Sequence, residues 1–299
     1  KAKGETLSLV GESGCGKSTV GRCVLRLVSL TSGEVLIDGQ RIDDLSAEAL
    51  RPLRRRMQVV FQDPFSSLNP RMRVRDILAE PLTNFGLATT RAEIDARLAA
   101  LMAKVGLRPE SVDRFPHEFS GGQRQRIGIA RALAAEPELI VCDEAVSALD
   151  VSVKAQIVNL LYDLQQELGL ALLFISHDLA IVEHMTHHVA VMYLGKIVEK
   201  GTRQQIFGRP LHPYTRALLS AVPAPDPRAT RERILLKGDV PSPINPPKGC
   251  HFHTRCPYVF ERCRREEPAL RQVEGAQTAA CHLHDLPAAE NPMLKAQAH

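Results

Sequence analysis

The chain has 299 residues, of which 44% are hydrophobic and 24% charged, and its formal net charge is +4. These values indicate a folded globular protein rather than a disordered or fibrous one, and the small, dispersed charge gives no support for a nucleic-acid partner. The longest apolar runs, such as residues 168–175, fall far short of the roughly 20 residues that span a bilayer. We therefore expect at most a peripheral role at a membrane and, because no signal peptide is recognisable, a cytoplasmic chain.

The first part of the chain predicts a strand, a turn and a helix. Residues 5–10 are a short apolar run, and residues 17–28 follow a glycine-rich turn with helical spacing. Residues 33–42 alternate around an Asp-Gly pair, which predicts a hairpin, and residues 57–61 predict another strand.

A predicted helical insert follows. Residues 75–85, 91–105 and 120–135 show helical spacing and contain few strand-forming side chains. We therefore expect residues 67–137 to form a helical subdomain.

After the insert, residues 139–142 and 171–175 are continuous apolar runs, which are typical of buried parallel strands. Between them an apolar stripe predicts a helix, so the segment reads as a strand-helix-strand crossover. The stripe consists of Val153, Ile157, Leu160, Leu161, Leu164 and Leu168. Residues 189–194 and 196–200 flank Gly195 as a predicted hairpin, and from about residue 204 frequent prolines predict a separate, loop-rich tail.

The sequence GESGCGKS at residues 11–18 fits the P-loop pattern between a predicted strand and a predicted helix. Glycines allow backbone N–H groups to surround phosphate oxygens, and the helix directs its positive end at the same charge. Lys17 would reach the β- and γ-phosphates, and the Ser18 hydroxyl would bind Mg²⁺. The residues predicted to bind ATP in this segment are Gly11, Ser13, Gly14, Cys15, Gly16, Lys17, Ser18 and Thr19.

The predicted strand at residues 139–142 ends in Asp143 and Glu144. Alone, this pair is as consistent with a solvated strand end as with a site. Beside a P-loop it gains meaning, because Mg²⁺ needs a hard oxygen ligand opposite Ser18 and the attacking water needs a base. We expect Asp143 to serve as the ligand and Glu144 as the base.

The sequence SGGQ at residues 120–123 begins a predicted helix that Ser120 can cap, and its glycines allow phosphate to approach the helix end. Together with the other motifs it closely resembles the ABC ATPase family, whose elements occur in the same order. Those motifs are the P-loop, Gln62, Asp143, Glu144, SALD at residues 147–150 and ISHD at residues 175–178.

The resemblance implies a head-to-tail arrangement in which ATP on one subunit's P-loop meets the SGGQ segment of its partner. It implies that Gln62 contacts Mg²⁺ or the water and couples to a membrane subunit, that Asp150 faces the partner, and that His177 holds the γ-phosphate. The catalytic residues would be Glu144, His177 and Gln62. The remaining predicted nucleotide and Mg²⁺ contacts are Ser120, Gly121, Gly122, Gln123, Asp150, Ser18, Gln62 and Asp143.

A narrower resemblance is carried by FQDP at residues 61–64, SLNPR at residues 67–71 and LHPYTRALL at residues 211–219. These segments are similar to the ATP-binding subunits of oligopeptide and dipeptide importers. The resemblance implies import of peptides at the cytoplasmic face of the cell membrane. The implied partners are a second ABC ATPase subunit forming a heterodimer, two transmembrane permease subunits and an extracytoplasmic peptide-binding protein.

The implied fold class is α/β. It has a P-loop (RecA-like) ABC ATPase core of residues 1–66 and 138–203, a helical subdomain of residues 67–137, and a small C-terminal cysteine-containing domain of residues 204–299. Two departures from the family stand out. The chain starts at Lys1 without the earlier strands and the aromatic residue that stacks on adenine, so we expect a truncated N-terminus, and Ala145 follows Glu144 where the family usually has Pro.

Four of the seven cysteines fall in the C-terminal segment: Cys250, Cys256, Cys263 and Cys281. In a cytosolic protein such a group favours metal binding over disulfides. Four thiolates could hold a [4Fe–4S] cluster or one Zn²⁺, and free thiols are a further alternative. Similarity to peptide importers favours the iron–sulfur cluster, with a structural role ahead of a redox-sensing one.

Other functions stay open at this point. A soluble ABC ATPase that acts on nucleic acid or the ribosome is one alternative, although such proteins typically carry two cassettes or a long coiled-coil insert. An importer of nickel chelates or glutathione is another, because cargo is selected by other subunits. A metal-dependent sensor in the tail, with ATP hydrolysis secondary, is the third.

Overall fold

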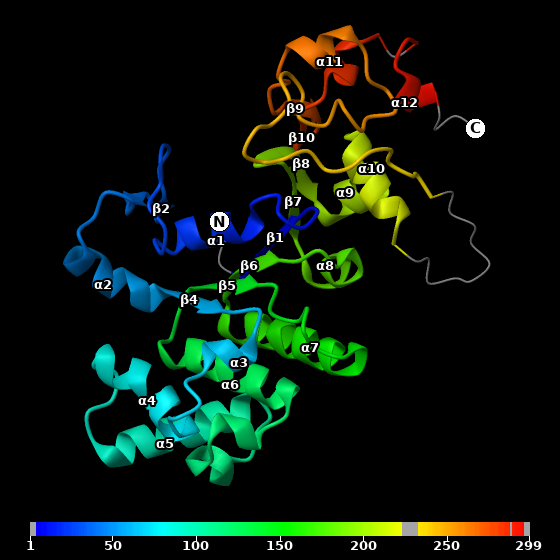
Figure 1. Ribbon diagram of the computed structural model, residues 1–299. Helices are drawn as coiled ribbons and strands as arrows, with labels where there is room; N and C mark the ends of the chain where they lie inside the picture. The colour runs from blue at the N-terminus through cyan, green and yellow to red at the C-terminus, as the bar shows by residue number, and fades with distance from the viewer. Residues whose placement is uncertain (1–3, 223–232, 288, 296–299) are drawn as a thin grey trace. The chain divides into compact units, whose positions relative to one another are not determined.

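The computed structural model describes residues 4–222, 233–287 and 289–295. It divides into two compact units, of which the first holds residues 1–6 and 18–175 and the second residues 7–17 and 176–299. Figure 1 shows both units. Because this division crosses the predicted core, the predicted domain boundaries stay predictions.

The first unit contains three parallel strands, β4 (Met57–Val60), β5 (Leu139–Asp143) and β6 (Ala171–Ile175). In their register Val60 pairs with Cys142, and Cys142 pairs with Phe174. Most side chains of β5 and β6 are buried, as the apolar runs predict. The helix α7 (Val151–Leu168) connects these two strands and ends at Gly169, whose φ is 63°.

The helix α1 (Lys17–Val24) packs closely on these strands. A Cβ at Gly21 would lie 2.9 Å from Cδ1 of Ile175 and 3.2 Å from Cγ1 of Val141, so only glycine allows this approach without a shift. The predicted extension of this helix to residue 28 is wrong. Arg26 has a left-handed φ of 54°, and the side chains of Leu27 and Val28 are exposed.

The predicted hairpin forms from β2 (Leu36–Ile37) and β3 (Gln40–Arg41). Asp38 and Gly39 both have positive φ, 49° and 79°, as the tightest hairpin turns require. The helix α2 (Ala47–Arg56) then leads into β4 and is capped by the Ser46 side chain, which accepts from the Ala49 N–H. The helix α2 has too few apolar positions for hydrophobic periodicity to predict it.

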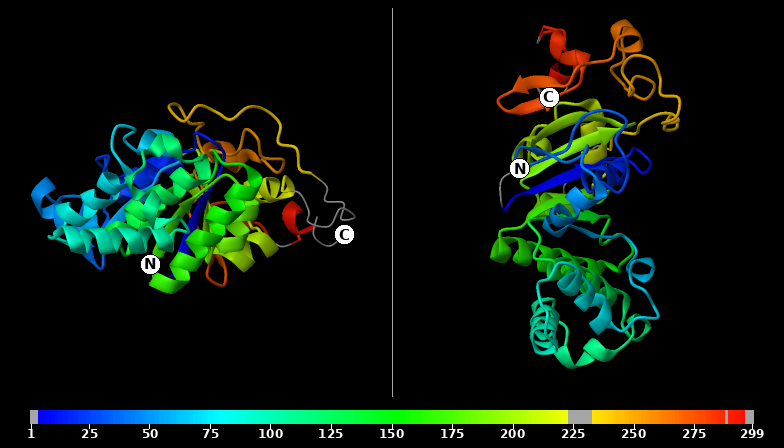
Figure 2. Two further views of the ribbon diagram at one scale, coloured as in Figure 1. Left: turned by 90° about the horizontal axis from the view of Figure 1, so that it is seen from below. Right: turned by 90° about the vertical axis from the view of Figure 1, so that its left-hand side faces the viewer.

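The helical part of the first unit contains α3 (Pro64–Ser67), α4 (Val74–Asn84), α5 (Arg91–Lys104) and α6 (Gly121–Ala134). Two short 3₁₀ helices, Pro109–Asp113 and Pro116–Glu118, precede α6. The helices α4, α5 and α6 lie together in both views (Figures 1 and 2). Their buried core includes Ile77, Leu78, Leu98, Met102 and Ile127. The predicted helices therefore form, with bounds shifted by one residue.

The second unit is built on a sheet of five strands among its described residues. The strand β1 (Thr6–Val10) lies parallel to β7 (His188–Tyr193), with Leu7 opposite His188. β7 pairs antiparallel with β8 (Lys196–Thr202), β8 with β10 (Gln277–Ala279), and β10 with β9 (Arg271–Glu274). The C-terminal segment thus adds strands to this sheet, which the prediction of a separate loop-rich tail missed.

Short helices complete the second unit: α8 (Leu179–Met185), α9 (Arg203–Gly208), α10 (Pro213–Ser220), α11 (Glu261–Arg265) and α12 (Pro292–Lys295), with a 3₁₀ helix at His282–Asp285. Its core contains the aromatic side chains of Tyr193, Tyr214 and Phe252, each at most 1% exposed. Among the helices that the structure describes, none combines the length and apolar character that crossing a membrane requires.

Candidate nucleotide-binding site

The loop of residues 11–17 follows β1 in the second unit and depends on its glycines. Gly11, Gly14 and Gly16 have φ values of 152°, 79° and 104°, which other residues rarely adopt. A Cβ at Gly11 would lie 2.1 Å from the Met192 carbonyl oxygen, so the loop passes directly against the end of β7. The glycines of the motif therefore allow both the curvature of the loop and its close packing.

The Lys17 side chain is buried within this loop, with 4% of its surface exposed. Its Nζ donates to the carbonyl oxygens of Gly11 at 2.9 Å and Glu12 at 3.0 Å. Burial raises the pKa of the neighbouring Cys15 thiol, while the Lys17 charge acts in the opposite direction. The ammonium is thus held at the loop, where phosphate oxygens would be stronger acceptors than the two carbonyls.

Ser18 and Asp143 meet in the first unit. The Ser18 Oγ donates to Oδ1 of Asp143 at 2.7 Å, and both residues are half-buried. The two residues are 125 positions apart in the sequence and are brought together because Ser18 lies in the first turn of α1 and Asp143 ends β5. A hydroxyl beside a carboxylate is an oxygen donor set that fits Mg²⁺.

Glu144 follows β5 in an unusual backbone conformation, with a left-handed φ of 49°. Its N–H donates to the Ile175 carbonyl at 3.0 Å. The Ser147 N–H and Oγ both donate to the Glu144 carbonyl at 3.0 Å. These bonds fix the backbone on both sides of the carboxylate and leave its half-buried side chain at the strand end.

The SGGQ segment caps α6. The Gln123 N–H donates to the Ser120 Oγ, and the Ser120 N–H donates to the Gln123 side-chain oxygen, which is a complete capping box. A Cβ at Gly122 would lie 2.4 Å from Cγ1 of Val153 in α7, so the glycine also serves helix packing. Ser120 is exposed, so this helix end is open to solvent in the chain itself.

The remaining predicted residues lie in several places. Gln62 and Asp150 are exposed in the first unit, and Asp150 precedes α7 without a capping bond from its side chain. His177 is exposed in the second unit. Of the predicted first-unit site residues, the structure joins Ser18 and Asp143 by a hydrogen bond, and it joins Ser120 and Gln123 within the cap.

Two residues that the sequence analysis missed hold the segment around Gln62. The Gln125 side chain is 1% exposed and donates its Nε2 to the Phe61 carbonyl at 3.2 Å. The Arg124 guanidinium lies over the Phe65 ring, 3.6 Å from its centroid. Both come from the first turns of α6, so SGGQ and Gln62 are linked through one helix. Sequence gave no signal for these contacts beyond the position of both residues next to SGGQ.

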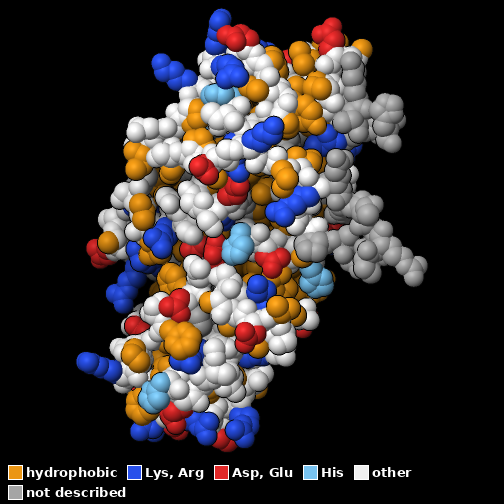
Figure 3. Space-filling view, turned by 45° about the vertical axis from the view of Figure 1, so that its right-hand side comes forward, with side chains coloured by type: hydrophobic (Ala, Val, Ile, Leu, Met, Phe, Trp, Pro, Cys, Tyr) orange, Lys and Arg blue, Asp and Glu red, His pale blue; other side chains and the backbone are white. Residues whose placement is uncertain are grey.

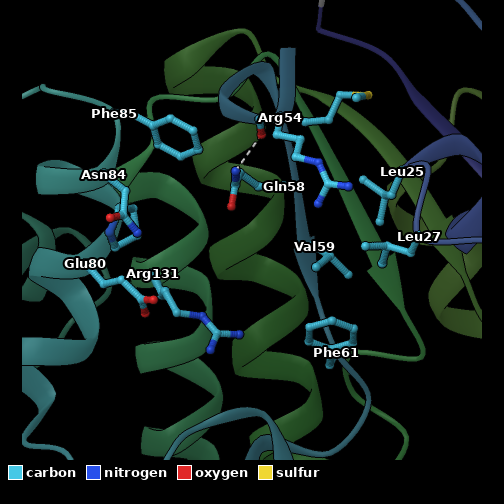
Figure 4. Close-up of a pocket in the computed structure, with 12 residues that line it drawn as sticks. Leu25, Leu27, Arg54, Gln58, Val59, Phe61, Glu80, Asn84, Phe85 and Arg131 are labelled. Atoms are coloured by element: carbon cyan, nitrogen blue, oxygen red, sulfur yellow. Dashed lines mark hydrogen bonds between the residues drawn. The ribbon is translucent and has the colours of Figure 1, made fainter. Parts of the chain in front are cut away.

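A cavity of about 370 Å³ lies beside β4 in the first unit, with Phe61 in its lining (Figure 4). Leu25 and Leu27 after α1, Val59 and Phe61 on and after β4, and side chains of α4 and α6 surround it. Its lining combines apolar side chains with charged ones, among them Arg54, Glu80 and Arg131. Burial lowers the pKa of Arg131, whose Nη1 donates to the Ser67 carbonyl at 2.6 Å.

The four C-terminal thiols lie in the second unit. Burial, together with the neighbouring thiols, raises the pKa of Cys250 to about 11 and that of Cys256 to about 12. Burial and the other three thiols also raise the pKa of Cys281. Nevertheless, no three His, Cys, Asp or Glu side chains within the described ranges are close enough to hold a metal ion. The thiols are thus of a type that can bind a cluster, but in this structure they are not gathered around one point as metal ligands are.

Comparisons with known proteins agree with this geometry. The ABC transporter family model matches residues 2–147, and the model of the oligopeptide/dipeptide transporter C-terminal region matches residues 198–263. A probable peptide ABC transporter ATP-binding protein of Sinorhizobium fredii is 58% identical over 280 residues, which cover 94% of this chain and 79% of the relative. The oligopeptide transport ATP-binding protein AppF of Bacillus subtilis is 54% identical, with coverage of 94% and 86%.

Solved structures give the same fold. The chain resembles cbiO1 of Clostridium perfringens, part of the transporter complex cbiONQ, with a TM-score of 0.62 and 29% identity, covering 69% of this chain and 80% of that one. It also resembles a dimeric ATP-binding cassette in a post-hydrolysis state with ADP and Pi, with a TM-score of 0.61 and 29% identity over 67% of this chain and 86% of that one. Fold and site define a P-loop nucleotide-binding cassette.

The chain belongs to the family of ABC transporter ATP-binding proteins, and it carries the C-terminal region of their oligopeptide/dipeptide branch. This agrees with both levels of resemblance found in the sequence. The C-terminal model ends at residue 263, so Cys281 lies outside its match.

Proposed function

We propose that this chain hydrolyses ATP to drive the import of peptides across the cytoplasmic membrane. The observation that carries the ATPase part is the hydrogen bond of 2.7 Å between Ser18 and Asp143, which joins the end of the phosphate motif to the end of a buried strand. The matched C-terminal region and the peptide transport proteins among the relatives support peptides as cargo, ahead of nickel chelates or glutathione.

The nucleotide phosphates would bind the backbone N–H groups of residues 11–17, and Lys17 would exchange its two carbonyl acceptors for phosphate oxygens. Ser18 and Asp143 would hold Mg²⁺, which when bound neutralises charge on the phosphates. Glu144 would orient the attacking water and accept its proton, because its backbone is fixed on both sides while its carboxylate stays at the strand end. His177 and Gln62 are assigned to the γ-phosphate and the water.

A second ATPase subunit would complete the site. The capped end of α6 at Ser120 is exposed and presents backbone N–H groups that favour phosphate. Asp150 is exposed as well, which suits a residue that faces a partner. We assign residues 120–123 and Asp150 to the nucleotide of the partner subunit, and we assign a heterodimer as the assembly.

One of the two permease subunits would dock at the cavity that Phe61 lines. Its lining is mixed, with leucine and aromatic side chains next to Arg54 and Glu80, as expected for a surface that receives a protein segment and not a small apolar ligand (Figure 4). Such docking places the chain at the cytoplasmic face of the membrane, with an extracytoplasmic peptide-binding protein reached through the permeases.

For the C-terminal thiols we propose a [4Fe–4S] cluster as a structural element, with zinc as the alternative. Support comes from the grouping of Cys250, Cys256, Cys263 and Cys281 in one short segment of the second unit, where burial raises the pKa of Cys250, Cys256 and Cys281. Analysis of anaerobically purified protein decides the matter. Equal amounts of iron and acid-labile sulfide support the cluster, zinc alone supports the alternative, and neither metal overturns both.

Isolation of the tagged chain from detergent-solubilised membranes tests the proposed function. We expect two integral membrane proteins and a second ATPase to co-purify, and the assembled complex to hydrolyse ATP faster when peptide and the binding protein are present. Phe85→Asp in the docking cavity should remove the membrane proteins while ATP binding persists. Co-purification of nucleic acid or ribosomal proteins in their place would overturn the proposal.

A further inference from the structure

The second residue of the phosphate loop, Glu12, contacts the C-terminal segment through both its backbone and its side chain. Its N–H donates to the Tyr214 hydroxyl at 2.8 Å, and its carboxylate meets Arg255. Its carbonyl oxygen is one of the two backbone carbonyls that accept from Lys17 Nζ. Every one of these residues belongs to the second unit. A shift of Glu12 would therefore move an acceptor of the phosphate-binding lysine.

The contact with Arg255 is a bidentate ion pair. Nη1 lies 2.7 Å from Oε2 of Glu12, and Nη2 lies 3.1 Å from Oε1. The Arg255 side chain is 8% exposed and that of Glu12 is 28% exposed, so water screens this pair less than a surface pair. Glu12 raises the pKa of Arg255, and the guanidinium stays charged. Paired planar groups fix orientation as well as charge.

The segment that bears Arg255 is anchored by aromatic packing. Phe252 lies between Cys250 and Cys256 in the sequence, and its ring is 5.2 Å from that of Tyr193 and 5.4 Å from that of Tyr214. The Tyr193 and Tyr214 rings are 4.8 Å apart. This cluster, with each ring at most 1% exposed, connects the cysteine segment to β7 and α10. This packing therefore holds the segment that carries Arg255 in a fixed position beside Glu12.

The guanidinium of Arg255 offsets the negative charge that Glu12 brings to the phosphate loop. A carboxylate in a loop that binds a triphosphate repels the ligand, and partial burial strengthens that repulsion. The guanidinium neutralises it while the Tyr214 hydroxyl holds the backbone. Two residues outside the phosphate motif, Arg255 and Tyr214, therefore set the charge and the position of the loop.

We infer that Arg255 is a positioning residue for the phosphate loop, so that the cysteine-bearing segment of residues 250–256 sets the affinity of the site for nucleotide. The inference rests on the proposed nucleotide function of residues 11–18. It assigns to the C-terminal region a direct part in ATP binding, in addition to any metal that its thiols hold.

Titration of the purified full chain with a fluorescent ATP analogue tests this assignment. Arg255→Ala should raise the dissociation constant about tenfold, because Glu12 is left unpaired. In the assembled transporter the change should appear in KM, with kcat at saturating ATP nearly unchanged. Glu12→Gln should act in the opposite direction and tighten binding, and the Glu12→Gln/Arg255→Ala double variant should recover most of the loss. Arg265→Ala, which breaks an exposed ion pair with Glu261 in the nearby helix α11, is the matched control.

The nucleotide affinity should fall in Arg255→Ala and rise in Glu12→Gln. A general loss of structure would lower the affinity in both variants. If Arg255→Ala does not fold, Glu12→Gln still decides, because the loss of a merely structural ion pair would not make the chain bind nucleotide more tightly. Unchanged affinity in these variants overturns the inference alone. Absence of nucleotide binding by the wild-type chain overturns the proposed function instead.

Discussion

Glu144 illustrates how single residues define this site. It has a left-handed φ of 49°, which non-glycine residues adopt at a cost of order 1 kcal/mol or more. The strain is held by hydrogen bonds from the Glu144 N–H to Ile175 and from Ser147 to the Glu144 carbonyl. Ala145, which follows where the family usually has proline, is 0% exposed, so the turn is packed rather than stiffened by a ring.

Glu144→Gln tests the role assigned to this carboxylate. We expect ATP binding to persist, because the P-loop is unaltered, and turnover in the assembled complex to fall at least ~100-fold, because an amide cannot accept the proton of water. Steady-state hydrolysis and nucleotide titration measure the two effects. Glu138→Gln, which removes a carboxylate paired with Arg56 on the surface, is the control and should leave turnover unchanged. Near-normal turnover of Glu144→Gln would refute the assigned role.

At the scale of elements, the sequence predicted best where the cause of structure is local. Periodicity gave the helices of the insert and the crossover strands, and the Asp-Gly turn gave the hairpin. Contacts between residues far apart in the sequence could not be predicted, because they leave no local pattern. Arg255 and Glu12 are 243 positions apart, and the pairing of β10 with β8 joins short segments without clear alternation. The expected end of α1 was wrong because a backbone turn at Arg26, not side-chain pattern, ends the helix.

The motif LHPYT at residues 211–215 is explained by a buried carboxylate at the start of α10. Glu199 in β8 is 0% exposed and accepts from the Leu211 and His212 N–H groups at 2.7 and 2.9 Å and from Gln277 Nε2 at 2.7 Å. Burial raises its pKa, while these donors act in the opposite direction. His212 caps the helix, since its Nδ1 accepts from the Tyr214 N–H at 3.1 Å.

This cap makes stability depend on pH. Burial, and then the neighbouring His284, lower the pKa of His212 to about 3, whereas an unfolded histidine titrates near 6.5. Between these values the unfolded chain binds the proton and the folded chain does not, so the free energy of unfolding falls as pH falls. We expect this residue to contribute a slope of up to ~1.4 kcal/mol per pH unit between about pH 6 and 4.

Urea unfolding of the wild type and His212→Asn over this range measures the contribution. Asparagine also caps helices but does not titrate, so the variant should lose the His212 part of the slope while it keeps the cap. Equal slopes in the two proteins would show that His212 is not neutral in the folded state.

At the scale of the molecule, charge bears on the choice of partner. The net charge is +4, and Figure 3 shows Lys and Arg interspersed with Asp and Glu on the face that it presents. Many arginines are already in ion pairs with carboxylates, among them Arg55, Arg56, Arg75, Arg97, Arg209 and Arg262. Binding to nucleic acid depends on cations that neutralise phosphates, and these pairs would have to break first.

We therefore expect no saturable binding of a random-sequence DNA duplex at physiological salt and protein concentrations up to about 10⁻⁵ M. Non-specific DNA-binding proteins have dissociation constants of roughly 10⁻⁴–10⁻⁶ M under such conditions. Fluorescence anisotropy measures this directly. Glu136 pairs with both Arg55 and Arg97, so Glu136→Lys releases two arginines and adds a cation at one place. That variant should gain measurable, salt-sensitive affinity. Saturation by the wild type at micromolar concentration would contradict the expectation and favour a nucleic-acid partner over a membrane one.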